Sequence, residues 1–319
     1  MKVIVAIIAS KDPVYNKFKE IWIKCINYIK TTTVANNYDF YFIYSDIKDK
    51  QNNIKITLDV YPNYTNYYYK YHDKSYETEL MKAQMEMLNK TIDFYEYIRK
   101  KLNLNDNNSY NHNTLTDTTY ILRTNLSSLF DFVKMYSYLL DKPKKNFFAG
   151  TINGFYNNIY TTISGMNTIL SLDLILYCID NHKNIMEYLK VLKYEDDTLS
   201  NYIIRNLNVY LINIKRLDFI EMEEVVLPTH TWPATPKSII YQKCKINDQD
   251  IFSFRFKTFN RTNDIEVMNI LNDNILKDCF NLNKFVENLS KSCGYLINTE
   301  SETYGELFSK KPFKVINLI

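Results

Sequence analysis

An α/β fold with a mainly parallel central sheet, flanking helices and a smaller C-terminal extension is the architecture that this sequence predicts. Residues 3–9 form a continuous apolar run rich in β-branched side chains, which is typical of a strand buried on both faces. Apolar residues then recur at every third or fourth position over 13–30, which predicts an amphipathic helix. Because strands and helices continue to alternate along the chain, the sheet should be mainly parallel.

The remaining elements follow in order from the same two patterns. Short apolar runs predict strands, whereas spacings of three and four predict helices. The expected strands are 40–44, 54–58, 119–122, 147–150, 209–214 and 251–256. The expected helices are 77–100, 129–140, 169–179 and 198–207, with two more in the tail.

A proline-rich segment at 228–236 interrupts any regular element and marks a domain boundary. We therefore expect a ligand-binding and catalytic domain at 1–235. Residues 236–319 would form an extension that closes the ligand site.

Composition and charge argue against several classes of protein. The formal net charge is +3, from 39 Lys and Arg against 36 Asp and Glu, which is small for a protein whose main partner is nucleic acid. The five cysteines form no C-x-x-C pair, which is typical of reduced thiols in a reducing compartment. No apolar run reaches the ~18 residues that a membrane span requires. We expect a cytoplasmic protein without a membrane span.

The turn after the first strand is informative, because ligands of open α/β sheets bind beyond the carboxyl ends of the strands. Residues 9–13 read Ala-Ser-Lys-Asp-Pro and contain neither a G-x-G-x-x-G motif nor a P-loop. Nicotinamide, flavin and P-loop chemistry are therefore poor fits. Ser10 in this turn and Asp46 after the second strand are candidates to contact a nucleoside, and a solvated turn is the alternative.

Arg123, Thr124 and Asn125 end the strand expected near 119–122. Burial of an arginine at the ligand edge is costly without an anion, and a diphosphate would supply one through bidentate hydrogen bonds. The alternative is that Arg123 pairs with a carboxylate while Asn125 helps to cap the following helix.

Two further charged segments have both functional and structural interpretations. The adjacent carboxylates at 195–197 could supply a general base, but they also suit a helix N-terminus, where negative charge is favourable. Arg255 and Lys257 share one face of the strand at 251–256, so they could bring two cations to a diphosphate. An edge strand with its charges toward solvent is the alternative.

Several segments, in order along the chain, resemble the GT-A glycosyltransferases, particularly β-1,3-galactosyltransferase-like enzymes and viral or bacterial sugar transferases. Residues 118–125 resemble the strand that normally ends in the family's Asp-x-Asp signature. Residues 148–150 and 160–174 resemble its SG-x-x-x-x-LS-x-D-L acceptor-side segment, and residues 194–200 resemble its ED-V helix start. The resemblance covers about residues 1–205.

The resemblance implies a Rossmann-like GT-A fold and a hexosyltransferase-like activity. A sugar would move, with inversion, from a nucleoside diphosphate (UDP in particular) to a hydroxyl of a glycan, a protein or a small molecule. Asp196 would be the general base, with Glu195 and Asp197 as alternates. The donor site would comprise Ser10, Asp46, Arg123, Asn125, Gly165, Arg255 and Lys257. A viral enzyme of this kind would work in the host cytoplasm.

The resemblance breaks at Arg123-Thr124-Asn125, which stands where two aspartates would hold Mn²⁺ or Mg²⁺ against the diphosphate. We therefore predict that side-chain cations replace the metal and that no cofactor is required. Binding of Mn²⁺ or Mg²⁺ with Asn125 as a single weak ligand is the alternative. An Arg123 that is locked onto an internal carboxylate would contradict the cationic clamp.

Two other functions remain open. The missing Asp-x-Asp is also compatible with a catalytically inactive protein of the same fold that binds a nucleotide-sugar or a glycan. The tyrosine-rich residues 63–76 resemble a strip for single-stranded nucleic acid. Because 28 tyrosines are spread along the chain and the net charge is small, we expect no nucleic-acid partner.

Overall fold

The computed structural model of the chain describes residues 1–10, 13–44, 54–55, 74–102, 104, 119–156, 160–192, 194–214, 216–220, 239–242, 251–257, 261–276 and 296–298. The chain divides into two compact units. The first comprises 1–126 and 132–213, and the second comprises 127–131 and 214–319. The second unit thus begins at Ile214 rather than at 236, and it takes a short segment from the middle of the chain.

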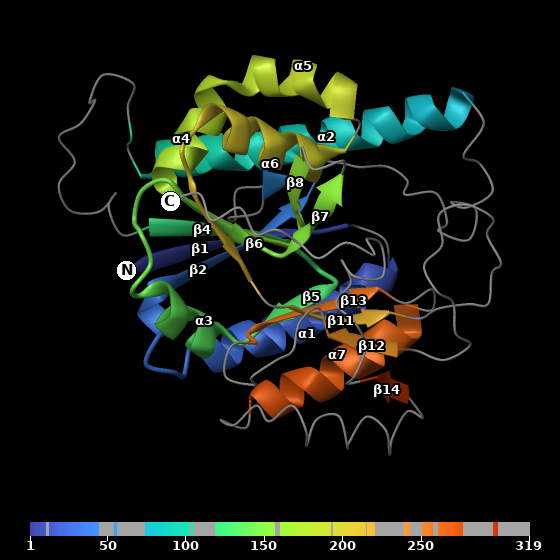
Figure 1. The fold of residues 1–319 in the computed structure, drawn as a ribbon. Coiled ribbons are helices and arrows are strands. Elements are labelled where there is room, and N and C mark those ends of the chain that lie inside the picture. The colour runs from blue at the N-terminus through green and yellow to red at the C-terminus, as the bar shows by residue number, and fades with distance from the viewer. Residues whose placement is uncertain are drawn as a thin grey trace. The chain divides into compact units, whose positions relative to one another are not determined.

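The first unit is built on a seven-stranded sheet in the order β10-β6-β9-β4-β1-β2-β3 (Figure 1). Its strands are β1 (Lys2–Ile8), β2 (Tyr38–Tyr44), β3 (Ile54–Lys55), β4 (Thr119–Asn125), β6 (Phe147–Gly150), β9 (Asn167–Ser171) and β10 (Tyr210–Asn213). Strand β9 is antiparallel to both of its neighbours, and the other neighbouring strands pair in parallel. This arrangement confirms the predicted α/β class with a mainly parallel sheet, and it is compatible with a Rossmann-like fold.

Helices cover both faces of this sheet (Figure 1). They are α1 (Pro13–Ile29), α2 (Lys74–Lys101), α3 (Phe132–Leu139), α4 (Leu172–Asp180), α5 (His182–Leu192) and α6 (Glu195–Asn206), with a 3-10 turn at Ala35–Asn37. One face of β1, with Ile4, Ala6 and Ile8, packs in a single apolar cluster with α2, α4, α5 and α6. The opposite face meets α1 and α3 through aromatic side chains, since Phe132 contacts both Trp22 and Phe40.

Two predicted helices begin as strands. The segment predicted as helix 129–140 starts with β5 (Ser128–Phe130), and the segment predicted as helix 169–179 starts with β9. Both strands are short and fully buried, so periodicity alone does not distinguish them from a buried helical turn. The structure also adds helix α5 and an antiparallel hairpin of β7 (Ile152–Tyr156) and β8 (Tyr160–Ile163), which no pattern indicated.

The second unit contains a five-stranded sheet in the order β14-β12-β11-β13-β5. Its C-terminal elements are β11 (Arg216–Ile220), β12 (Ile239–Gln242), β13 (Ser253–Lys257), α7 (Arg261–Ile275) and β14 (Leu296–Asn298). Strand β5 comes from between β4 and α3 of the first unit and pairs antiparallel with β13. Backbone bonds at both ends fix this pairing, from Phe256 N–H to Ser127 C=O at 2.8 Å and from Asp131 N–H to Phe252 C=O at 2.9 Å.

The position of a ligand edge follows from the strand order of the first sheet. The order of successive strands reverses between β1 and β4, which is the kind of switch point where open α/β sheets bind ligands. The two strands pair in parallel up to Ile8 and Asn125, so their carboxyl ends meet at one edge of the sheet. Ser10 and Asn125 therefore lie at the same edge.

Candidate functional site

The turn that carries Gly165 lies at this edge of the sheet. Strand β9 runs antiparallel to β4, and its second register position pairs Thr168 with Arg123 near the carboxyl end of β4. The turn at 164–166, which precedes β9, therefore sits beside the end of β4. Thr124 holds it there, because its hydroxyl donates a 2.7 Å hydrogen bond to the carbonyl of Met166.

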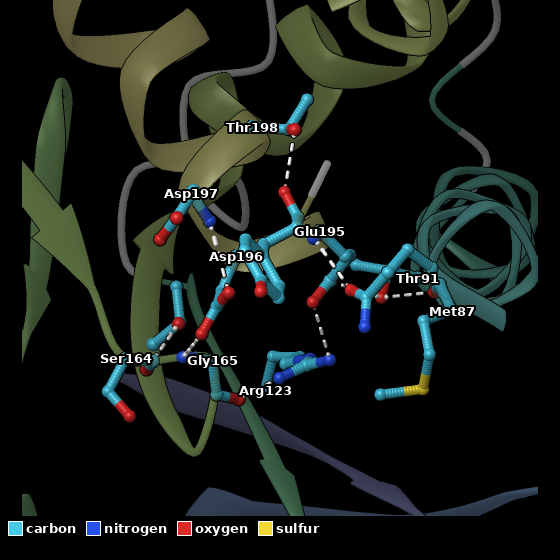
Figure 2. A network of polar contacts seen from close by, with 12 residues as sticks. Met87, Thr91, Arg123, Ser164, Gly165, Glu195, Asp196, Asp197 and Thr198 are labelled. Atoms are coloured by element: carbon cyan, nitrogen blue, oxygen red, sulfur yellow. Dashed lines mark hydrogen bonds and ion pairs between the residues drawn. The ribbon is translucent and has the colours of Figure 1, made fainter. Parts of the chain in front are cut away.

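Helix α6 presents the acidic cluster to this turn. Glu195, Asp196 and Asp197 form the first turn of the helix, where the helix dipole favours negative charge. One Asp196 carboxylate oxygen accepts the N–H of Gly165 at 3.2 Å, and the other accepts the N–H of Asp197 at 3.1 Å (Figure 2). Asp196 is partly exposed, whereas Glu195 is buried. The cluster therefore divides into two partly exposed carboxylates, Asp196 and Asp197, and the buried carboxylate of Glu195.

Arg123 and Glu195 form a buried ion pair below Asp196 (Figure 2). A guanidinium nitrogen lies 3.0 Å from the Glu195 carboxylate, and each side chain is only 5% exposed. A second guanidinium nitrogen donates to the carbonyl of Gly165. Thr91 of α2 donates to the other Glu195 oxygen at 3.2 Å. One arginine thus joins β4 to helix α6 and to the turn at 164–166.

Burial changes the pKa of Glu195 and of the neighbouring Tyr95. Burial raises the pKa of Glu195, whereas the positive charge of Arg123 and the hydrogen bond from Thr91 act in the opposite direction. Burial also raises the pKa of Tyr95 well above its usual value, and its hydroxyl has no hydrogen-bond partner in the described part of the chain. The ion pair is therefore shielded from water. In this buried position, its charges interact more strongly than they would at the surface.

The pairing corrects the prediction that Arg123 clamps a diphosphate. Two of its guanidinium nitrogens bind Glu195 and Gly165, so its charge is neutralised within the protein. This is the carboxylate pairing that the sequence left open as the alternative. Glu195 is corrected as well, because a carboxylate that is buried and bound to Arg123 and Thr91 is not available to an acceptor hydroxyl.

The other predicted site residues are distributed over the two units. Ser10 and Asn125 are partly buried at the ligand edge of the first unit. Asp46 lies outside the described residues. Arg255 and Lys257 lie two residues apart on β13 of the second unit, as the predicted strand required. The structure thus brings together Arg123, Gly165 and the acidic cluster, whereas the role of the two cations on β13 remains a prediction.

Helix α2 contributes site residues that sequence reasoning missed. Thr91 binds Glu195, and the side-chain carbonyl of Gln84 accepts the N–H of Glu195 at 2.8 Å. Both side chains lie on a helix whose spacing indicated only packing against the core. A polar residue between apolar positions, as at Thr91, is a weak signal that by itself names no partner.

Comparisons with known proteins assign no family. No model of a protein family matches the chain, and a search of curated proteins found no match. Among the described residues, no group of three or more His, Cys, Asp or Glu side chains is arranged to hold a metal ion. None of the helices that the structure describes has both the length and the apolar character needed to cross a membrane.

Proposed function

We propose that the chain is a glycosyltransferase of the GT-A type that transfers a sugar from a nucleoside-diphosphate donor to an acceptor hydroxyl, with Asp196 as the general base. One observation carries this proposal. A partly exposed carboxylate lies next to the carboxyl edge of a mainly parallel sheet, and two backbone N–H groups orient it. The order of family-like segments along the chain supports the same activity.

The geometry of Asp196 suits proton abstraction. Each carboxylate oxygen has about two lone-pair sites, and each accepts one N–H, so one site on each oxygen remains for an acceptor hydroxyl. As the acceptor oxygen forms its bond to the anomeric carbon, its proton passes to Asp196. The bond from that carbon to the donor phosphate breaks, and the nucleoside diphosphate leaves with the electron pair. General-base catalysis of this kind contributes about 10²–10⁴-fold to the rate.

The donor would lie along the ligand edge, where Ser10 follows the end of β1 and Asn125 ends the neighbouring strand β4. Arg123 is not part of this proposed donor site, because its guanidinium is already paired with the Glu195 carboxylate. Arg255 and Lys257 lie on β13 of the second unit, where they remain proposed ligands of an anion. Whether Mn²⁺ or Mg²⁺ also takes part is decided by the experiment that follows.

Donor binding is tested by thermal shift with UDP, GDP and their sugars, each with Mn²⁺, with Mg²⁺ and with EDTA. A ligand present at 100 times its Kd stabilises the folded state by about 2.7 kcal/mol, so a true donor should raise Tm by several degrees. A shift that persists in EDTA indicates metal-independent binding. If no nucleotide or nucleotide-sugar changes Tm under any of these conditions, the proposal fails.

Transfer is tested with Asp196→Asn, which keeps the size of the side chain and removes the base. We expect turnover to fall by about 10²–10⁴-fold while the donor-induced Tm shift is retained. Glu187→Gln is the matched control, because this carboxylate on α5 is 70% exposed and pairs with Lys190 at the surface. Full turnover in Asp196→Asn would reject Asp196 as the base. Donor binding without transfer in the wild-type protein would instead favour the inactive, sugar-binding alternative.

A further inference from the structure

We infer that Arg123 is a positioning residue for Asp196, acting through the backbone of Gly165. The inference rests on the proposed function, since it assigns a second residue to the same site. Arg123 does not contact Asp196 in any hydrogen bond or ion pair of the described structure. Its influence must therefore pass through the groups that it does bind, which are Gly165 and Glu195.

Gly165 is held from both sides. Its carbonyl accepts a hydrogen bond from Arg123, and its N–H donates to the Asp196 carboxylate at 3.2 Å (Figure 2). These two groups belong to the two peptide units that flank one α-carbon. Arg123 fixes the peptide unit that contains the Gly165 carbonyl. It thereby also limits rotation of the peptide unit that contains the Gly165 N–H, which is the unit that orients Asp196.

The close approach of these groups requires glycine at position 165. A β-carbon there would lie 3.1 Å from the central guanidinium carbon of Arg123 and 3.1 Å from the β-carbon of Asp196. Such distances are too short for ordinary contacts, so a larger residue would force Arg123 and Asp196 apart. The space around Gly165 is thus shaped by the residue that positions the base and by the base itself.

Glu195 links Arg123 to the start of helix α6. It is the residue before Asp196 on α6, and its carboxylate is bound to Arg123 at 3.0 Å. The N–H of Glu195 is bound as well, at 2.8 Å from the side-chain carbonyl of Gln84. Arg123 therefore fixes the start of α6 and the turn at 164–166 together, and these are the two elements that determine the direction of the Asp196 carboxylate.

The substitution Arg123→Lys separates this role from simple charge neutralisation. A lysine ammonium can still neutralise Glu195, but it lacks the planar fork that binds two acceptors at once. We therefore expect the ion pair to survive and the bond to the Gly165 carbonyl to be lost. Arg205→Lys is the matched control, because Arg205 lies in the last turn of the same helix and binds Tyr188 at an exposed position.

The readout that is independent of activity is amide hydrogen exchange at Gly165. The chain has only five glycines, so selective ¹⁵N-glycine labelling of the full chain yields a simple NMR spectrum. In Arg123→Lys, the turn loses the bond between residue 123 and the Gly165 carbonyl, so it should open more easily. We therefore expect exchange of the Gly165 N–H to accelerate about tenfold, as loss of one hydrogen bond implies. Exchange at Gly150 on β6 should stay unchanged, and Arg205→Lys should match the wild-type protein at both glycines.

The catalytic readout is a split between kcat and KM. A base displaced by about 1 Å lowers the rate by up to about 10²-fold, so kcat of Arg123→Lys should fall by 10- to 100-fold, as an order-of-magnitude expectation, while KM for the donor is retained. Unchanged Gly165 exchange, or accelerated exchange with normal kcat, would overturn the inference. If the wild-type protein transfers no sugar at all, the proposed function fails, and the exchange data still decide whether Arg123 holds the turn.

A second variant covers the case in which Arg123→Lys does not fold. Asp196→Asn keeps the ion pair but changes the acceptor of the Gly165 N–H from a carboxylate to an amide. The Gly165 amide signal should then shift more than any other glycine signal. A Gly165 signal that does not respond would show that the bond to Asp196 is absent in solution, and the inference would fall.

Discussion

Gly165 lies between the charged side chains of Arg123 and Asp196, and both of them bind the turn at 164–166 through this residue. Its carbonyl binds Arg123 and its N–H binds Asp196. A residue with a side chain would have to displace one of them, because a β-carbon would come within 3.1 Å of carbon atoms on both. The stability of the turn and the geometry of the site therefore both depend on the absence of a side chain at position 165.

We predict that Gly165→Ala destabilises the protein by about 1–3 kcal/mol, which is the usual cost of inserting a group into a close-packed site. Urea denaturation followed by circular dichroism would measure the loss. Ser137→Ala on α3 is the control, since surface substitutions usually change stability by less than about 0.5 kcal/mol. Equal midpoints for both variants would show that the turn adapts without strain.

The residues of the site were only partly predictable. Asp196 and Gly165 were identified from local motifs, and the structure places them in contact. The sequence also showed that Arg123 ends an apolar strand, but it did not reveal the partner of this residue. Glu195 lies 72 positions further along the chain, and only the fold brings the two charges together. The two contacts from α2 were unpredictable for the same reason.

At the scale of elements, the aromatic layer between α1, α3 and β2 holds one face of the sheet. Trp22 is fully buried in this layer, with its ring 5.9 Å from that of Phe132. Its indole N–H donates a 3.1 Å hydrogen bond to the carbonyl of Leu126, just beyond the end of β4. Tyr38 bonds the carbonyl of Phe132 at 2.7 Å in a similar way. The layer thus supports the strand end that carries the site.

We predict that Trp22→Phe lowers the free energy of unfolding by about 1–3 kcal/mol, because the buried carbonyl of Leu126 loses its donor. Thermal or urea unfolding monitored by far-ultraviolet circular dichroism would show the change. Tyr210→Phe is the control, because Tyr210 is 61% exposed on β10. A Trp22→Phe variant as stable as this control would mean that the N–H contributes nothing to the strand end.

Long elements followed from the sequence more readily than short ones. The pattern over 13–30 predicted α1, and the run at 3–9 predicted β1, each within one residue of the observed ends. The three residues of β5 and the five of β9 carry no periodicity of their own. Their strand conformation is set by partners that are distant in sequence, such as β13 for β5. Local patterns cannot show such pairings.

At the scale of the whole molecule, a single cut cannot separate the two units. Strand β5 belongs to the sheet of the second unit, although its neighbours in the chain, β4 and α3, belong to the first. Leu129 and Phe130 on this strand are fully buried. A chain that lacks the second unit would therefore retain an apolar strand without its partner β13.

We predict that a chain ending at Asn213 aggregates and binds a hydrophobic dye more strongly than the full chain, because an unpaired apolar strand is an aggregation site. Light scattering and dye fluorescence would measure both effects. The same truncation with Leu129→Ser and Phe130→Ser should bind less dye. A truncated chain that stays monomeric and binds no more dye than the full chain would contradict this expectation.

The placement of β5 also sets an order of events during synthesis. Ribosomes extend a chain from its N-terminus at about 5–20 residues per second, so residues 128–130 emerge well before residues 253–257 exist. The rest of the first unit is translated in the interval between these two strands. The nascent protein must therefore carry β5 without its partner for several seconds, and the sheet of the second unit can close around β5 only after β13 has been synthesised.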